Sequence, residues 1–154
     1  MINDALAKAR IVLIEDNPSD VYLMGFALEQ SGLVFELTNF QSGADALPIL
    51  CPEPDSEQNS DDLLVPDLIL LDLNTPGPDG FEVLARIRCN AELAGVPVAI
   101  ITSSESPADK HRAKLLGASM YIQKPTQLTA FINDVGNAVK TLLAIGKPAA
   151  QGAA

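Results

Sequence analysis

Runs of consecutive apolar residues are the feature that most constrains the fold of this chain. Residues 11–14 and 68–71 are wholly apolar, and residues 96–101 are apolar apart from Pro97. A strand with one face in water alternates apolar and polar side chains, whereas a strand buried on both faces does not. These runs therefore predict strands of a parallel sheet that is covered by helices on both sides.

Helical patterns fall between the expected strands. Weaker strands are expected at 34–38 and 120–122, and helices at 17–31, 42–50, 80–89, 106–116 and from 128 onward. Asn17-Pro18 is typical of a helix start, and Gly32 and Gly117 of helix ends. The alternation predicts an α/β fold, a doubly wound five-stranded parallel sheet in the flavodoxin-like order 2-1-3-4-5.

The 154 residues fit one domain. We expect a lead-in at 1–9, the domain at 10–144 and a flexible tail at 145–154. Residues 51–66 contain prolines and many acids, which predicts an exposed loop whose carboxylates are solvated.

Charge and composition exclude several classes of function. The net charge of −10 argues against binding to nucleic acid or to anionic membranes. No apolar run is long enough to span a bilayer, and residues 1–5 lack the features of a signal peptide. Cys51 and Cys89 form no CxxC pair, so we expect reduced thiols and a soluble cytoplasmic protein.

Chemically active side chains stand where the expected strands end. Glu15 and Asp16 follow the first strand, and Asp72 follows the third. Thr102 ends the fourth strand, and Lys124 follows the fifth. The carboxyl ends of parallel strands form one edge of the sheet, where ligands bind. The sequence therefore predicts a site that combines three carboxylates, a hydroxyl and an amine.

This combination suits phosphoryl transfer. Crowded carboxylates need a cation, and hard oxygen ligands select Mg²⁺ or a similar ion. Asp72 can act as a nucleophile that forms an aspartyl-phosphate. Lys124 supplies a point charge and Thr102 a donor for phosphoryl oxygens, and the remaining task is positioning and charge neutralisation.

The motifs at the strand ends resemble those of the receiver domain of two-component response regulators. Besides Glu15-Asp16, they are Asp-Leu-Asn-Thr-Pro-Gly-Pro-Asp-Gly at 72–80, Thr-Ser-Ser at 102–104 and Tyr-Ile-Gln-Lys-Pro at 121–125. The resemblance extends from Ile11 to about Leu143. It implies a signalling protein that catalyses only its own phosphorylation and dephosphorylation.

The resemblance also implies a role for each site residue. Asp72 would be the phosphoacceptor, with a phosphohistidine of a sensor histidine kinase as donor. Glu15, Asp16, Asp72 and the backbone carbonyl of Asn74 would arrange Mg²⁺, partly through water. Lys124 would pair with the phosphoryl group, and the Lys124–Pro125 peptide bond would be cis.

A switch and a set of partners are implied in the same way. Thr102 would move toward the phosphoryl group and Tyr121 would turn inward behind it. The face formed by the fourth helix, the fifth strand and the last helix would report this change to a partner. The segment Glu-Asp-Asn-Pro-Ser-Asp at 15–20 and Leu-Asp-Leu-Asn at 71–74 resemble small stand-alone regulators paired with bacterial phytochromes, which often dimerise through that face. Gly77-Pro78 departs from their pattern.

Three alternative functions differ in the residues that they require. A phosphatase with an Asp nucleophile needs a second Asp where this chain has Asn74. A flavodoxin needs a phosphate-binding loop rich in Ser, Thr and Gly after the first strand, where this chain is acidic. A receiver-like interaction module that works without phosphorylation, or a phosphate sink, stays open. His111 has no neighbouring Cys and is expected at the surface.

Overall fold

The computed structural model describes residues 8–53 and 65–146, in which strands and helices alternate. The strands are β1 (Ala9–Ile14), β2 (Phe35–Phe40), β3 (Leu68–Leu71), β4 (Val98–Thr102) and β5 (Met120–Gln123). The helices are α2 (Pro18–Gln30), α3 (Gly43–Leu50), α4 (Gly80–Cys89), α5 (Pro107–Leu115) and α6 (Leu128–Gly146).

The five strands form one parallel sheet in the order β2-β1-β3-β4-β5. This order confirms the predicted doubly wound topology. The order reverses beside β1, because the chain leaves β1 for β2 on one side and later returns to β3 on the other. The carboxyl ends of β1 and β3 therefore lie next to each other at the switch point, where such sheets bind ligands.

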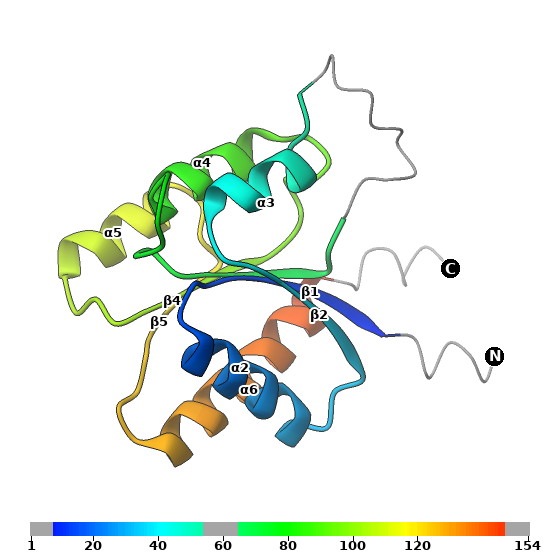
Figure 1. Cartoon of the computed structure of the whole chain (residues 1–154), viewed down its shortest axis with the longest axis vertical. Helices are drawn as coiled ribbons and strands as arrows, with labels where there is room; N and C mark the ends of the chain where they lie inside the picture. Colours follow the sequence, from blue (N-terminus) through cyan, green and yellow to red (C-terminus); the bar gives the residue numbers. More distant parts are fainter. Residues whose placement is uncertain (1–7, 54–64, 147–154) are drawn as a thin grey trace.

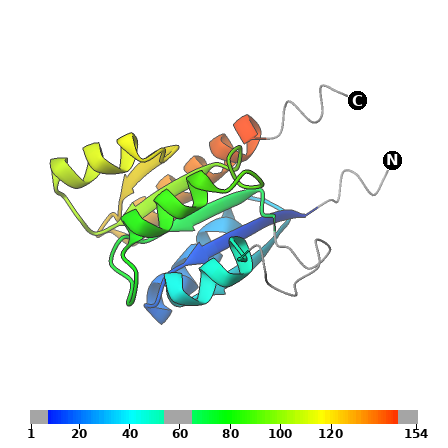
Figure 2. The same ribbon diagram turned by 90° about the horizontal axis from the view of Figure 1, so that it is seen from above.

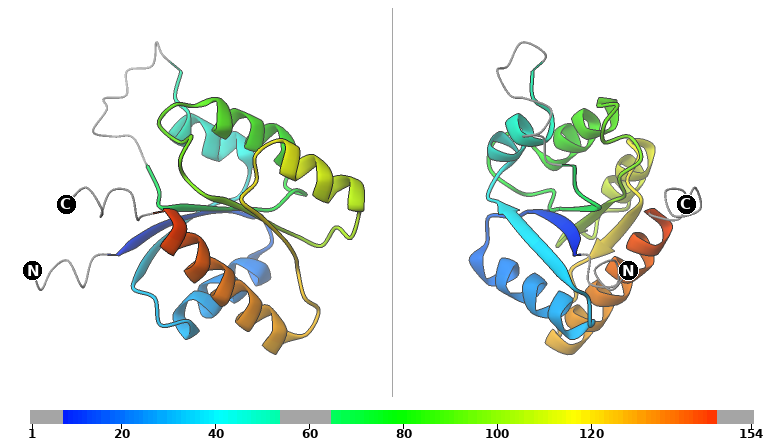
Figure 3. Two further views of the ribbon diagram at one scale, coloured as in Figure 1. Left: turned by 180° about the vertical axis from the view of Figure 1, so that it is seen from behind. Right: turned by 90° about the vertical axis from the view of Figure 1, so that its right-hand side faces the viewer.

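Helices cover both faces of the sheet (Figures 1 and 2). Helices α3, α4 and α5 lie on one face, and α2 and α6 lie side by side on the other (Figure 3). Side chains along each strand alternate between two apolar cores: in β1, Val12 and Ile14 join the first core, and Ile11 and Leu13 the second. Because both faces need apolar side chains, the buried strands show no alternation in sequence.

Several boundaries differ from the sequence-based expectation. Strand β4 was expected at 96–101 but runs from Val98 to Thr102. It begins later than expected because Pro97 has no N–H to donate to a ladder. Strand β2 runs two residues further than expected. Helix α6 continues through Gly146, so residues 145–146 belong to the helix and not to a tail. Residues 1–7 of the expected lead-in, 54–64 of the acidic segment and 147–154 of the tail lie outside the described residues, and Ala9, expected in the lead-in, is the first residue of β1. No helix of the described residues combines the length and apolarity needed to cross a membrane.

A close approach at Gly80 positions the segment that follows β3. The Gly80 N–H donates to the Leu73 carbonyl at 3.2 Å. A Cβ atom at Gly80 would lie 2.6 Å from the Leu73 Cα and 3.0 Å from the Asp72 carbonyl oxygen. Only glycine therefore lets the first turn of α4 pack directly on the backbone that carries Asp72.

We predict that Gly80→Ala lowers the free energy of unfolding by roughly 1–3 kcal/mol, because the added methyl group forces a backbone shift in a packed site. Gly25→Ala is the matched control, since a Cβ there meets nothing within 4 Å. That change should raise stability by up to about 1 kcal/mol, the gain of alanine over glycine inside a helix. Urea unfolding of both variants measures the difference. Equal stability of the two variants would contradict the close approach.

Candidate functional site

Main-chain hydrogen bonds fix three of the predicted site residues at the carboxyl edge of the sheet. Each residue stands directly after a strand, and its N–H donates to the last residue of a neighbouring strand. The bonds are Glu15 N–H to the Phe40 carbonyl at 2.9 Å, Asp72 N–H to the Ile14 carbonyl at 3.1 Å and Lys124 N–H to the Thr102 carbonyl at 2.7 Å. The sheet ladder itself therefore sets the positions of these side chains.

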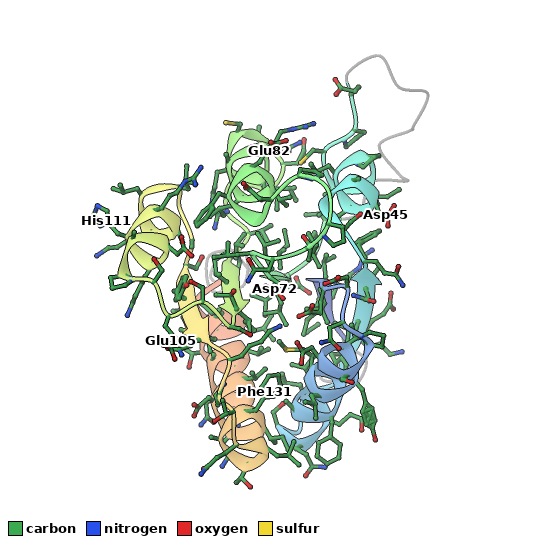
Figure 4. The ribbon with its side chains drawn as sticks, turned by 60° about the vertical axis from the view of Figure 1, so that its left-hand side comes forward. Asp45, Asp72, Glu82, Glu105, His111 and Phe131 are labelled. Carbon is green, nitrogen blue, oxygen red and sulfur yellow. The ribbon has the colours of Figure 1, made fainter. Side chains whose placement is uncertain are left out.

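The ammonium of Lys124 is the centre of the site. Its Nζ lies 2.6 Å from Glu15 Oε1, 2.6 Å from Asp20 Oδ2 and 2.9 Å from Asp72 Oδ2. The side chains of Lys124 and Asp72 are each 9% exposed, and that of Glu15 is 1% exposed. Asp72 lies at the middle of this edge, between the two layers of helices (Figure 4). One cation thus joins α2 to the residues that directly follow β1, β3 and β5.

Burial and mutual charge shift the protonation of this cluster. Burial raises the pKa of the Glu15 carboxyl to about 7, and the neighbouring Asp72 adds to the rise while the Lys124 ammonium opposes it. Burial alone would lower the pKa of Lys124. The hydrogen bonds to Asp20, Glu15 and Asp72 outweigh burial and raise that pKa above its usual range. Lys124 is therefore a permanent cation at physiological pH.

Asp72 is also held from the side of Thr102. Its Oδ1 accepts a hydrogen bond from the Asn74 backbone N–H at 3.0 Å. The Asn74 side-chain amide in turn donates to Thr102 Oγ1 at 3.4 Å. Thr102 is fully buried at the end of β4. Asn74 therefore links the carboxylate of Asp72 to the hydroxyl of Thr102.

Ser104 connects Thr102 to Tyr121 and to α5. The Ser104 N–H donates to Thr102 Oγ1 at 3.3 Å, and the Tyr121 hydroxyl donates to the Ser104 carbonyl at 3.2 Å. The Ser104 hydroxyl donates to Asp109 Oδ2 at 2.7 Å in the first turn of α5. The half-buried Tyr121 thus points toward the loop after β4.

The structure brings Asp20, and not Asp16, into contact with Lys124. Asp16 is exposed, and its side chain makes no hydrogen bond or ion pair within the described part of the chain. Asp20, which sequence reasoning missed, contacts Lys124 instead. A signal was available, because Asp20 lies in the first turn after the Asn17-Pro18 helix start. Side chains on a helix tilt toward its N-terminus, which here faces the strand ends.

Two further expectations have clear outcomes. No peptide bond in residues 8–53 and 65–146 is cis, so the expectation of a cis Lys124–Pro125 bond is wrong for this structure. Trans is the ground state even before proline, by about 0.5–1 kcal/mol. His111 is exposed on the outer side of α5, away from Asp72, as expected for a surface residue (Figure 4).

The donor chemistry of this edge suits a hard divalent cation. The carboxylates of Glu15 and Asp72 converge on one point of positive charge, and Asp16 directly follows Glu15 in sequence. Mg²⁺ binds through one or two carboxylates, keeps several waters and needs no dedicated cage of protein ligands. The described residues contain no group of three acidic, histidine or cysteine side chains arranged to hold a metal ion. The residues present fit a cation that shares its coordination with water and phosphate.

We predict that Glu15 makes the stability of the metal-free protein depend on pH. Its folded pKa of about 7 lies above the ordinary 4.5, so its contribution is fully present below pH 4.5 and is lost as pH rises to 7. Over that interval the wild type should lose about 1–3 kcal/mol of unfolding free energy relative to Glu15→Gln. Urea unfolding in EDTA at a series of pH values measures this loss. The exposed Glu36 supplies a Glu→Gln control, and equal slopes for the two variants would contradict the prediction.

A family model and a curated relative both identify this chain as similar to response regulators. The family model described as the response regulator receiver domain matches residues 11–135. The response regulator Rcp1 of Synechocystis sp. is 35% identical over 118 residues, which are 77% of this chain and 78% of Rcp1.

Solved structures agree with the sequence relatives. The phosphorylated cyanobacterial phytochrome response regulator RcpA superimposes with a TM-score of 0.78 and 33% identity, covering 90% of this chain and 96% of RcpA. The Mn²⁺-bound form of Rcp1 superimposes with a TM-score of 0.77 and 31% identity, covering 88% of this chain and 94% of that structure. With the sheet order, the strand-end residues and the family match in agreement, this chain belongs to the response regulator receiver domain family.

Proposed function

We propose that this chain accepts a phosphoryl group on Asp72 from a phosphohistidine of a sensor histidine kinase, in a reaction that depends on Mg²⁺. One observation carries the proposal: the buried Lys124 ammonium joins the carboxylate of Asp72 to that of Glu15 at the switch point of the sheet. Such a site can accept a dianionic group only where fixed positive charge faces it. Receiver domains are signalling proteins, and their partners are histidine kinases.

The reaction is a displacement at phosphorus. A carboxylate oxygen of Asp72 attacks the phosphorus atom, a P–O bond forms and the P–N bond to the donor imidazole breaks. The bonding electron pair stays on the imidazole nitrogen, which leaves neutral or takes up a proton from solvent. Lys124 already lies 2.9 Å from Asp72 Oδ2, so its charge offsets the charge that the transferred group brings. Thr102 Oγ1 supplies a hydroxyl that can donate to a phosphoryl oxygen.

We assign the metal to the oxygen donors beside this lysine. Glu15, Asp16 and Asp72 would hold Mg²⁺ together with the Asn74 backbone carbonyl. A bound divalent cation would neutralise the carboxylates and withdraw charge from phosphoryl oxygens. The other protein groups keep Asp72 oriented: the Asn74 N–H holds Oδ1 while Lys124 holds Oδ2.

Output in this proposal runs through Thr102 and Tyr121. The two side chains are joined by Ser104, which accepts from the Tyr121 hydroxyl and donates its N–H to Thr102. A hydroxyl that turns toward a phosphoryl group on Asp72 would give up its bond to Ser104 and so disturb the loop that leads into α5. We propose that the face formed by α5, β5 and α6 signals by protein contact. The same face could join two copies of the chain.

The kinase partner is proposed from the relatives. Rcp1 and RcpA are response regulators, and RcpA is described as a phytochrome response regulator. At 35% and 33% identity over most of both chains, the relatives support a bacterial phytochrome with kinase activity as the partner of this chain.

We predict that incubation with Mg²⁺ and acetyl phosphate adds a single phosphoryl group, which intact mass spectrometry detects. Asp72→Asn, which keeps the shape of the acceptor without its nucleophilic carboxylate, should show no adduct. EDTA should reduce the rate at least tenfold, since the site then lacks the cation that offsets three carboxylates.

An adduct that is labile to hydroxylamine would identify an acyl phosphate. An adduct that persists in Asp72→Asn would place the acceptor elsewhere. Absence of any adduct from acetyl phosphate and from a phosphorylated sensor kinase would favour an interaction module that works without phosphorylation.

A further inference from the structure

Asp20 holds the catalytic lysine, although no part of the proposed function uses it. Its Oδ2 lies 2.6 Å from Lys124 Nζ, which is closer than the 2.9 Å between Lys124 Nζ and Asp72 Oδ2. The Asp20 side chain is 23% exposed, against 1% for Glu15 and 9% for Asp72. The lysine therefore shares its charge with one acid that reaches solvent and two that scarcely do.

The start of α2 places Asp20 with little freedom. Asn17 caps the helix by accepting a hydrogen bond from the Ser19 N–H at 2.9 Å, and Pro18 occupies the first turn. Asp20 follows in that turn, where the N-terminal end of the helix dipole favours a carboxylate. Its side chain consequently extends toward the strand ends and reaches Lys124 without strain in the backbone.

The donors of Lys124 are fully used. An ammonium has three N–H donors, and Lys124 directs them to three carboxylates. The contact with Asp72 Oδ2 stays with the acceptor group, so a further donor for the incoming phosphoryl oxygens must come from Glu15 or from Asp20. Water cannot take the place of the lysine at Glu15, whose side chain is 1% exposed, whereas water already reaches Asp20, so Asp20 is the less costly partner to release.

We propose that Asp20 is a positioning residue that holds Lys124 before phosphorylation and is the partner that Lys124 releases to the phosphoryl group. The inference rests on the proposed function of Asp72. Because Asp20 competes with the phosphoryl group for one ammonium, its negative charge slows phosphorylation. A structural role at the start of α2, or a role as a metal ligand, predicts the opposite sign.

The test compares rates of adduct formation from acetyl phosphate at saturating Mg²⁺, followed by intact mass. Asp20→Asn should react roughly 3- to 10-fold faster than the wild type, the effect expected when a partly exposed ion pair no longer has to be broken. Asp20→Glu keeps a carboxylate and should return the rate to within about twofold of the wild type. Urea unfolding of each variant checks that the fold is retained.

A double variant separates contact with Lys124 from charge in general. Ser19→Asp with Asp20→Asn keeps the net charge and the acid in the first turn of α2, but moves the carboxylate to an exposed neighbouring position. The faster rate should persist in this double variant. A return to the wild-type rate would show that overall charge or the helix dipole causes the effect, and would overturn the proposal.

Two other outcomes would also overturn it. If the wild type forms the adduct and Asp20→Asn forms it at the same rate or more slowly, the role of Asp20 is refuted while Asp72 remains the acceptor. A wild type that takes no phosphoryl group from acetyl phosphate or from a phosphorylated sensor kinase would refute the proposed function itself. The two failures are thus distinguished by the wild-type sample alone.

Discussion

The contact between the Lys124 ammonium and three carboxylates is the interaction on which the rest of the site depends. Its members come from residues 15, 20, 72 and 124, so the cluster closes only when β1, α2, β3 and β5 have all reached their places. Removal of the cation would leave buried carboxylates facing one another, which costs several kcal/mol. The neighbouring apolar strands β1 and β3 therefore have two roles: their side chains form the core, and their ends place the carboxylates beside Lys124.

The apolar runs predicted the sheet well because burial on both faces leaves a strong signal. Residues 11–14 and 68–71 could belong to few other structures, and the order of elements then fixed which side chains meet at the carboxyl edge. Glu15, Asp72, Thr102 and Lys124 follow from this rule alone. The rule identifies the residue directly after a strand, such as the buried Glu15, and does not fix the side chain of the exposed Asp16, which stands one residue further into the loop.

Side chains on helices and loops were harder to predict, because their directions depend on local geometry. Asp20 reaches the site only because Asn17 and Pro18 begin α2 at a particular residue, and a shift of one residue would turn it away. The hydrogen bonds from Asn74 and Ser104 to Thr102 depend on the backbone conformations of two loops. Short polar residues are common in many turn types, so the sequence does not predict these conformations. The Lys124–Pro125 bond has the trans form, which is the ground state of a peptide bond before proline.

The two edges of the sheet show why the buried cation of the site is a lysine. At the amino-terminal edge, the guanidinium of Arg88 donates to the carbonyls of Gly117 at 2.8 Å and Val96 at 2.7 Å. The planar guanidinium of Arg88 is bound to neutral carbonyls and has no anionic partner that another anion could replace, so it holds loops in place. At the carboxyl edge, Lys124 is bound to carboxylates through a flexible stem. One anionic oxygen can replace another around its ammonium while the cation stays paired. The edge with arginine is thereby suited to stability, and the edge with lysine to accepting an anion.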